Sequence, residues 1–300
     1  MCSIFVTMDK LTTIKIGGVP EHFNLPWHLA LEDNAFEKAG INLQWEDIPE
    51  GTGLMSKLLR DEELDVACIL TDGIVKDIIG GNKSRILQVY VRSPLLWGVH
   101  APGQIEADRT EQLEDGKIAI SRYGSGSHLM SYLLAKRHGW DTNDIEFELV
   151  NTLDGAVNAL STNKAQLFLW ERYMTQPFVD QGIFKRLETI ATPWPSFVIA
   201  ATESCIREKE EALSKMLYII NTYTSDFKHI PSIDRTIASH YNLQVGDVQQ
   251  WLLRTEYSSD QLWESTVNKI IEEFTAVGII DRLVGLEDLI YNIPKIDEEE

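Results

Sequence analysis

A turn of glycine and serine carries the strongest chemical signal in the sequence. It covers residues 123–128 (YGSGSH) and joins a strand-like apolar run at 118–120 to a helical pattern. Free backbone N–H groups, two serine hydroxyls and the positive end of a helix would converge there, which suits a phosphate, sulfonate or carboxylate. The alternative is that Ser125 or Ser127 only caps the helix. The first candidate site is therefore Ser125, Gly126 and Ser127.

A carboxylate beside a tryptophan follows another apolar run, 166–170. Trp170 and Glu171 could bind an amine or a cationic ring, through charge and a cation–π contact. The alternative is that Glu171 is only an acid at a helix start, which the helix dipole favours.

Other polar and aromatic residues follow expected strand ends, where ligands of open α/β sheets bind. We include the following in the candidate site: His22, Phe23, Asn24, Thr52, Thr71 and Asp72. Thr52 and Asp72 could each only cap a helix.

Enzyme motifs do not account for these residues. Leu129 stands where a dinucleotide fingerprint has its third glycine or alanine, and neither Ser125 nor Ser127 lies in a nucleophile elbow. The seven histidines are scattered, and the sequence contains no His-Glu-x-x-His motif. The sequence thus favours binding over catalysis, and we predict no catalytic residue, no cofactor and no metal site.

The composition limits the partners. The chain has 300 residues, with 27 basic and 46 acidic side chains and a formal charge of −19. A nucleic-acid-binding protein needs basic side chains to neutralise phosphates, so nucleic acid is excluded as a partner. Residues 297–300 are all acidic, and we predict a disordered tail over 294–300.

The N-terminal residues lack the basic start and the apolar length of a signal peptide. No apolar stretch is long enough to span a membrane. We therefore expect a cytoplasmic protein without membrane insertion.

The elements that would position the candidate residues follow an α/β order. Short strand-like runs alternate with helical patterns from about residue 13 to residue 201, and long helical patterns follow. The order repeats once, because the runs at 66–70 and 166–170 each follow a helix and each end at polar residues. We predict two lobes, each with a mixed sheet flanked by helices, which face a shared cleft.

Two stretches rich in proline and tryptophan, 93–103 and 192–198, bracket the second series of elements. We expect them to be hinge crossings that absorb the dihedral change when the lobes close. Lobe 1 would then comprise residues 12–99 and 198–293, and lobe 2 residues 100–197. Trp194, in the second crossing, joins the candidate site.

Several stretches resemble the type II periplasmic-binding-protein family, in the branch of sulfonate-binding and thiamine-precursor proteins. They are GVPEHFNLP at 18–26, FEKAGI at 36–41, DVA at 65–67, YGSGS at 123–127 and WE at 170–171. The resemblance covers about residues 12–280. It is strongest to a small fungal and bacterial subgroup without an export signal, typified by a Candida protein. It implies a Venus-flytrap fold in which two lobes close over a small molecule.

The resemblance implies a binding function of the kind that serves ABC transporters. The expected partner is a small anionic metabolite, in particular a thiamine or pyrimidine precursor or a similar phosphorylated or sulfonated compound. Ser125 and Ser127 would hold the anion, and Phe23, Tyr123 and Trp194 would stack on a flat ring. We also consider a weak homodimer.

Two other functions stay open. The alternative is an enzyme of thiamine-pyrimidine or pyridoxal metabolism, since a branch of similar fold makes the thiamine pyrimidine. That branch uses a cysteine-rich motif and a lysine, and neither is present at the matching positions of this chain, which has three cysteines. A sensor or scaffold that binds proteins is the third possibility.

Overall fold

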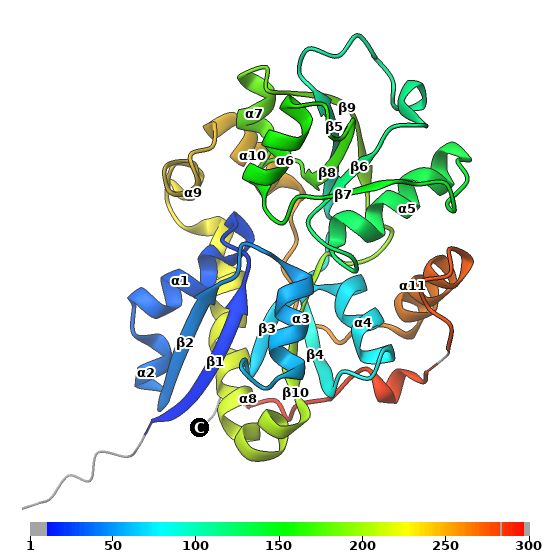
Figure 1. The fold of residues 1–300 in the computed structure, drawn as a ribbon. Helices are drawn as coiled ribbons and strands as arrows, with labels where there is room; N and C mark the ends of the chain where they lie inside the picture. Colours follow the sequence, from blue (N-terminus) through cyan, green and yellow to red (C-terminus); the bar gives the residue numbers. More distant parts are fainter. Residues whose placement is uncertain (1–10, 283, 297–300) are drawn as a thin grey trace, which may run out of the picture.

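Two five-stranded sheets form the centre of the structure, a computed structural model in which residues 11–282 and 284–296 are described (Figure 1). In each sheet the fourth strand of the order runs antiparallel to both its neighbours, and the first three strands are parallel. This antiparallel strand is the first one that the chain forms after crossing from the other sheet. The predicted α/β fold with two mixed sheets is confirmed.

The first sheet has the strand order β2-β1-β3-β10-β4. Its strands are β1 (Thr12–Gly18), β2 (Ile41–Asp47), β3 (Val66–Leu70), β4 (Ser84–Val91) and β10 (Phe197–Thr202). The second sheet has the order β7-β6-β8-β5-β9. Its strands are β5 (Leu96–Pro102), β6 (Ile118–Ile120), β7 (Phe147–Leu149), β8 (Leu167–Glu171) and β9 (Phe184–Ala191).

Helices flank both sheets (Figure 1). Those of the first unit are α1 (Leu25–Glu32), α2 (Ala35–Lys38), α3 (Thr52–Arg60), α4 (Thr71–Ile79), α8 (Glu203–Asp226) and α11 (Glu264–Ala276). Those of the second unit are α5 (Gly126–His138), α6 (Leu153–Ser161) and α7 (Gln176–Asp180). Two more, α9 (Ile233–Tyr241) and α10 (Val245–Arg254), follow α8. Short 3-10 helices are η1 (His22–Asn24), η2 (Thr110–Leu113), η3 (Phe227–His229) and η4 (Leu286–Asp288).

Local sequence explains the elements next to the cleft. All five residues of β3 are buried, as expected of a central strand with both faces covered. Helix α5 begins after Ser125, whose Oγ accepts the N–H of His128 at 3.3 Å. It ends at Gly139, whose φ of 73° lies in the left-handed region that suits glycine. Ser125 thus sets the start of α5 after the short turn that follows β6, and Gly139 sets its end.

Two crossings join the sheets, as predicted: one between β4 and β5, the other between β9 and β10. They are bound to each other, because Thr192 donates its N–H to the Leu95 carbonyl and accepts the Leu95 N–H on its Oγ1, both at 3.0 Å. The hydroxyl of Ser196 also donates to the Ser93 carbonyl at 2.8 Å. The predicted lobe boundaries, 99/100 and 197/198, fall inside β5 and β10 rather than within the crossings.

The C-terminal part of the described chain contacts α8. The carbonyl of Pro294 accepts a hydrogen bond from Ser214 Oγ at 2.8 Å. The predicted tail, 294–300, therefore begins at a residue that is held in place, and residues 297–300 lie outside the described residues. In the described part of the chain, every helix is too short or too polar to cross a bilayer.

Candidate functional site

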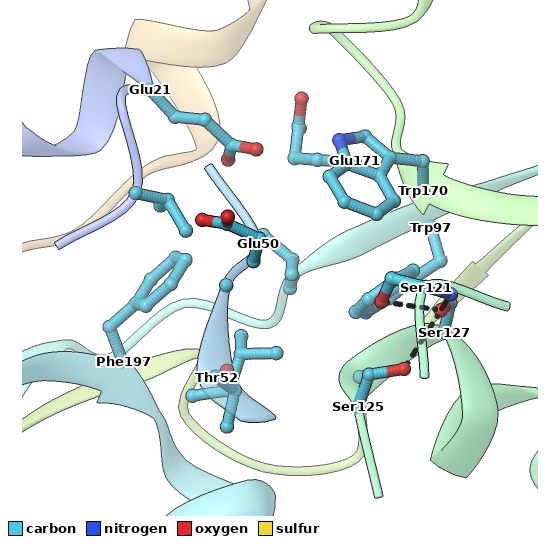
Figure 2. Close-up of a pocket in the computed structure, with 15 residues that line it drawn as sticks. Glu21, Glu50, Thr52, Trp97, Ser121, Ser125, Ser127, Trp170, Glu171 and Phe197 are labelled. Atoms are coloured by element: carbon cyan, nitrogen blue, oxygen red, sulfur yellow. Dashed lines mark hydrogen bonds between the residues drawn. The ribbon is translucent and has the colours of Figure 1, made fainter. Parts of the chain in front are cut away.

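A pocket lies between the two sheets, at the carboxyl ends of β1, β3, β6 and β8 (Figure 2). Its free volume is about 50 Å³. A single water needs roughly 10–15 Å³ by this measure, so the pocket holds only a few small groups as it stands. The first unit contributes Val19, Glu21, Glu50, Gly51, Thr52, Leu70 and Phe197, and the remaining wall consists of Leu95, Trp97, Ser121, Ser125, Gly126, Ser127, Trp170 and Glu171.

Three serine hydroxyls form one end of the pocket. Ser127 Oγ accepts the N–H of Ser121 at 3.0 Å and lies 3.1 Å from Ser125 Oγ. Ser121 Oγ completes the cluster, 3.4 Å from Ser127 Oγ. The N–H groups of Gly126 and Ser127 find no acceptor within the described residues, as expected for the first turn of a helix. Hydroxyls and free N–H groups therefore converge at the start of α5.

Trp97 also lines the pocket. Its residue is 4% exposed, and its Nε1 is buried without a hydrogen-bond partner in the described structure. The indole therefore contributes a buried aromatic wall to the pocket.

Gly126 lets the two walls of this end approach closely. A Cβ on Gly126 would lie 2.6 Å from Leu70 Cδ1 and 2.7 Å from Trp97 Cη2. Leu70 belongs to the first sheet and Trp97 to the second. The glycine therefore leaves room where the start of α5 meets both units.

Carboxylates line the other side of the pocket (Figure 2). Burial raises the pKa of Glu21 to about 7, and a hydrogen bond with the Trp170 side chain partly offsets this. Burial, and then the charge of Glu21, raise the pKa of Glu171 well above its usual value. Glu171 Oε2 accepts the N–H groups of Tyr173 and Met174, both at 2.7 Å, which holds this carboxylate in place.

Six of the predicted site residues line the pocket: Thr52, Ser125, Gly126, Ser127, Trp170 and Glu171. Ser125 is both the N-cap of α5 and a pocket residue, so the two interpretations of it hold together. Thr52 is the first residue of α3, whose N-cap position is taken by Gly51, so Thr52 is not its cap.

Three predicted residues of η1 lie in the interior behind the pocket. His22 is fully buried among aromatic rings, and neither ring nitrogen has a hydrogen-bond partner among the described residues. Burial lowers its pKa to about 3. Phe23 packs its ring against Phe197 and Trp251. Asn24 donates its side-chain amide to the Val19 carbonyl at 2.8 Å.

The other four predicted residues also lie away from the pocket lining. Thr71 and Asp72 begin α4 and are buried, and Asp72 Oδ1 accepts the N–H of Gly73 at 2.8 Å. Tyr123 is 64% exposed and rests its ring edge-on against His128. Trp194 is buried against Phe274 of α11.

Pocket residues outside the prediction include Glu21, Glu50, Trp97 and Ser121. Glu21 is directly followed by the three predicted residues of η1, Glu50 precedes Thr52 by two positions, and Trp97 lies in the first expected hinge stretch. The sequence therefore marks the segments around Glu21, Glu50 and Trp97. It does not indicate which side chain in each segment faces the pocket. In the described ranges, no group of three or more His, Cys, Asp or Glu side chains is arranged to hold a metal ion.

Comparison with known proteins gives a family match and a shared fold. Residues 97–190 match the family model described as Ca3427-like PBP. The structure is similar to that of the Candida albicans CA3427 gene product, described as defining a family with the generic periplasmic binding protein fold. The TM-score is 0.86 at 24% identity, with 97% of this chain and 100% of that chain covered. No curated protein sequence matches the chain.

Two further binding proteins share the fold at lower identity. The alkanesulfonate-binding protein SsuA from Xanthomonas axonopodis pv. citri, bound to MOPS, gives a TM-score of 0.79 at 15% identity, with 94% of this chain and 99% of that chain covered. The nitrate-binding protein NrtA from Synechocystis PCC 6803 gives a TM-score of 0.70 at 14% identity, with 90% of this chain and 82% of that chain covered. The predicted resemblance to type II periplasmic binding proteins, and to a Candida protein among them, is confirmed.

Proposed function

We propose that this chain is a ligand-binding protein that takes a small molecule with an anionic group between its two sheets. The observation that carries the proposal is the set of donors at the start of α5. Three serine hydroxyls converge at one end of the pocket with the N–H groups of Gly126 and Ser127, which have no acceptor within the described residues. A sulfonate, phosphonate, phosphate or carboxylate could accept from several of them at once.

The names of similar proteins support this class of ligand. One is called alkanesulfonate-binding and another nitrate-binding. A thiamine or pyrimidine precursor is the finer candidate that the family resemblance gives. For such a ring, Trp97 and Trp170 would offer the aromatic surfaces, because Tyr123 and Trp194 lie away from the pocket lining.

The serine hydroxyls provide the first test. We expect Ser125→Ala with Ser127→Ala to weaken the binding of a short sulfonate or phosphonate by about tenfold or more, because hydrogen bonds to charged groups contribute roughly 1.5–3 kcal/mol each. Isothermal calorimetry with methanesulfonate, methylphosphonate and acetate measures this. Thr152→Ala is the matched control, since Thr152 Oγ1 caps α6 in the same unit by accepting the Gly155 N–H at 3.2 Å and lies outside the pocket. Equal losses in both variants would contradict the anion site.

Lobe closure is a separate part of the proposal. The two units would act as lobes that rotate about the paired crossings, and a ligand larger than the free volume of about 50 Å³ would require them to open and close again. We expect the radius of gyration from small-angle scattering to fall when a calorimetrically verified ligand saturates the protein. Identical scattering profiles with and without that ligand would contradict closure.

A further inference from the structure

Two carboxylates of the pocket, Glu21 and Glu171, come from different sheets and lie on the same side of it (Figure 2). Glu21 follows β1, whereas Glu171 is the last residue of β8. Their residues are only 8% and 4% exposed. Within residues 11–282 and 284–296, neither carboxylate forms an ion pair with a basic side chain.

The cation that acts on Glu171, Arg186, is committed to other partners. Arg186 is close enough to lower the pKa of Glu171, but its guanidinium donates to Gln176 Oε1 at 2.7 Å and to the Arg172 carbonyl at 2.9 Å. Arg186 also does not line the pocket. The third pocket carboxylate, Glu50, lies near Arg122: burial lowers the pKa of Arg122, and the charge of Glu50 partly offsets this. Glu21 and Glu171 are therefore two buried pocket carboxylates without an ion pair in the part of the chain that the structure describes.

Two like charges that are buried together destabilise a protein unless a proton or a cation is bound there. We propose that a protonated amine of the ligand occupies the space between Glu21 and Glu171, so that the ligand is a small zwitterion. The inference of an anionic end rests on the proposed function, whereas the inference of an amine end rests on the carboxylate pair alone.

The surroundings of the pair fit an ammonium group. Charge-assisted hydrogen bonds from one ammonium can reach both carboxylates, and Trp170 supplies an aromatic face in the same pocket for a cation–π contact. Because Glu21 follows a strand of the first sheet and Glu171 ends a strand of the second, one bound amine would link the two units directly. The raised pKa of Glu21, about 7, is consistent with a group that lacks a cation in the ligand-free chain.

The test compares ligands that differ only in the amine. The protein is titrated by calorimetry at pH 7.5 with 3-aminopropanesulfonate and, separately, with propane-1-sulfonate. The matched pairs with one and two carbons are titrated in the same way, so that three spacings between the amine and the sulfonate are compared. Propylammonium chloride is the probe with the amine alone. The proteins are the unaltered chain, Glu21→Gln, the double variant Glu21→Gln with Glu171→Gln, and Asp72→Asn. Asp72 is the matched control because it is also a buried carboxylate but lies outside the pocket lining.

We expect the aminosulfonate to bind the unaltered chain and Asp72→Asn at least about tenfold more tightly than the plain sulfonate, a difference of ~1.4 kcal/mol. The preference should fall in Glu21→Gln and vanish in the double variant, with the affinity for propane-1-sulfonate retained or raised. The single variant matters because Glu171 also accepts two backbone N–H groups, which a change there could disturb.

Other results separate this inference from the proposed function. Equal affinities for both members of each pair in the unaltered chain, or a preference that survives in the double variant, would overturn the amine site and leave the anion site standing. Binding of propylammonium that depends on both carboxylates, without binding of any sulfonate, would support the amine site and contradict the anion site. If no probe binds, both proposals are contradicted.

Discussion

Glu21→Gln is expected to stabilise the ligand-free protein by about 3 kcal/mol at pH 8 and by almost nothing at pH 4. The pKa of Glu21 rises from 4.5 to about 7 in the folded chain because the carboxyl is buried. At a pH between 4.5 and about 7, the unfolded chain has released the proton of Glu21 and the folded chain still binds it. The free energy of unfolding therefore falls as the pH rises through this window, and the loss is complete above about pH 7. Glutamine has no proton to lose, so the variant escapes this loss.

Urea unfolding at pH 4, 5, 6, 7 and 8 measures the difference between the variant and the unaltered chain. Asp72→Asn is an informative control, because burial raises the pKa of Asp72 from 3.8 to about 6. Its effect should have the same sign but level off by about pH 6, whereas that of Glu21→Gln should keep growing to about pH 7. A stability difference between the variant and the unaltered chain that does not change with pH would show that Glu21 is not buried as described.

The fold could be predicted because its signals are local and repeated. The wholly apolar run of β3 and the matching run of β8, one hundred residues later, each end at the cleft. The crossings were marked by proline and tryptophan, although the exact residue at which each sheet begins was not. That boundary depends on pairing between strands far apart in the sequence, such as β5 with β9, which no local pattern specifies.

The site could be predicted only where one segment specifies its own geometry. The turn before α5 does so, because a strand, a cap and a helix follow one another within a few residues. The turn after β1 does not. In η1 the chain rotates so that Glu21 lines the pocket while His22 enters an aromatic cluster with Trp251, whose ring centroid lies 4.4 Å away. That contact joins residues more than two hundred positions apart, so sequence alone could not choose between these neighbours.

Gly126→Ala is expected to weaken ligand binding more than any other single change in the pocket, on the order of 100-fold. The added methyl would lie 2.6 Å from Leu70 Cδ1 and 2.7 Å from Trp97 Cη2, well inside van der Waals contact. Leu70 can rotate away, but Trp97 is a rigid, buried ring, so the start of α5 must shift. Calorimetry with the tightest-binding probe measures the loss. Overpacking of this kind also destabilises proteins by roughly 1–3 kcal/mol, which urea unfolding would report.

The loss must be separated from a general effect of alanine at a helix start. Gly246 is a matched control, because it lies in the first turn of α10 and a Cβ there meets nothing within 4 Å. Gly246→Ala should leave binding unchanged and add up to about 1 kcal/mol of stability, since alanine favours a helix over glycine. If Gly126→Ala binds the probe as tightly as the unaltered chain, then the start of α5 does not contact the ligand.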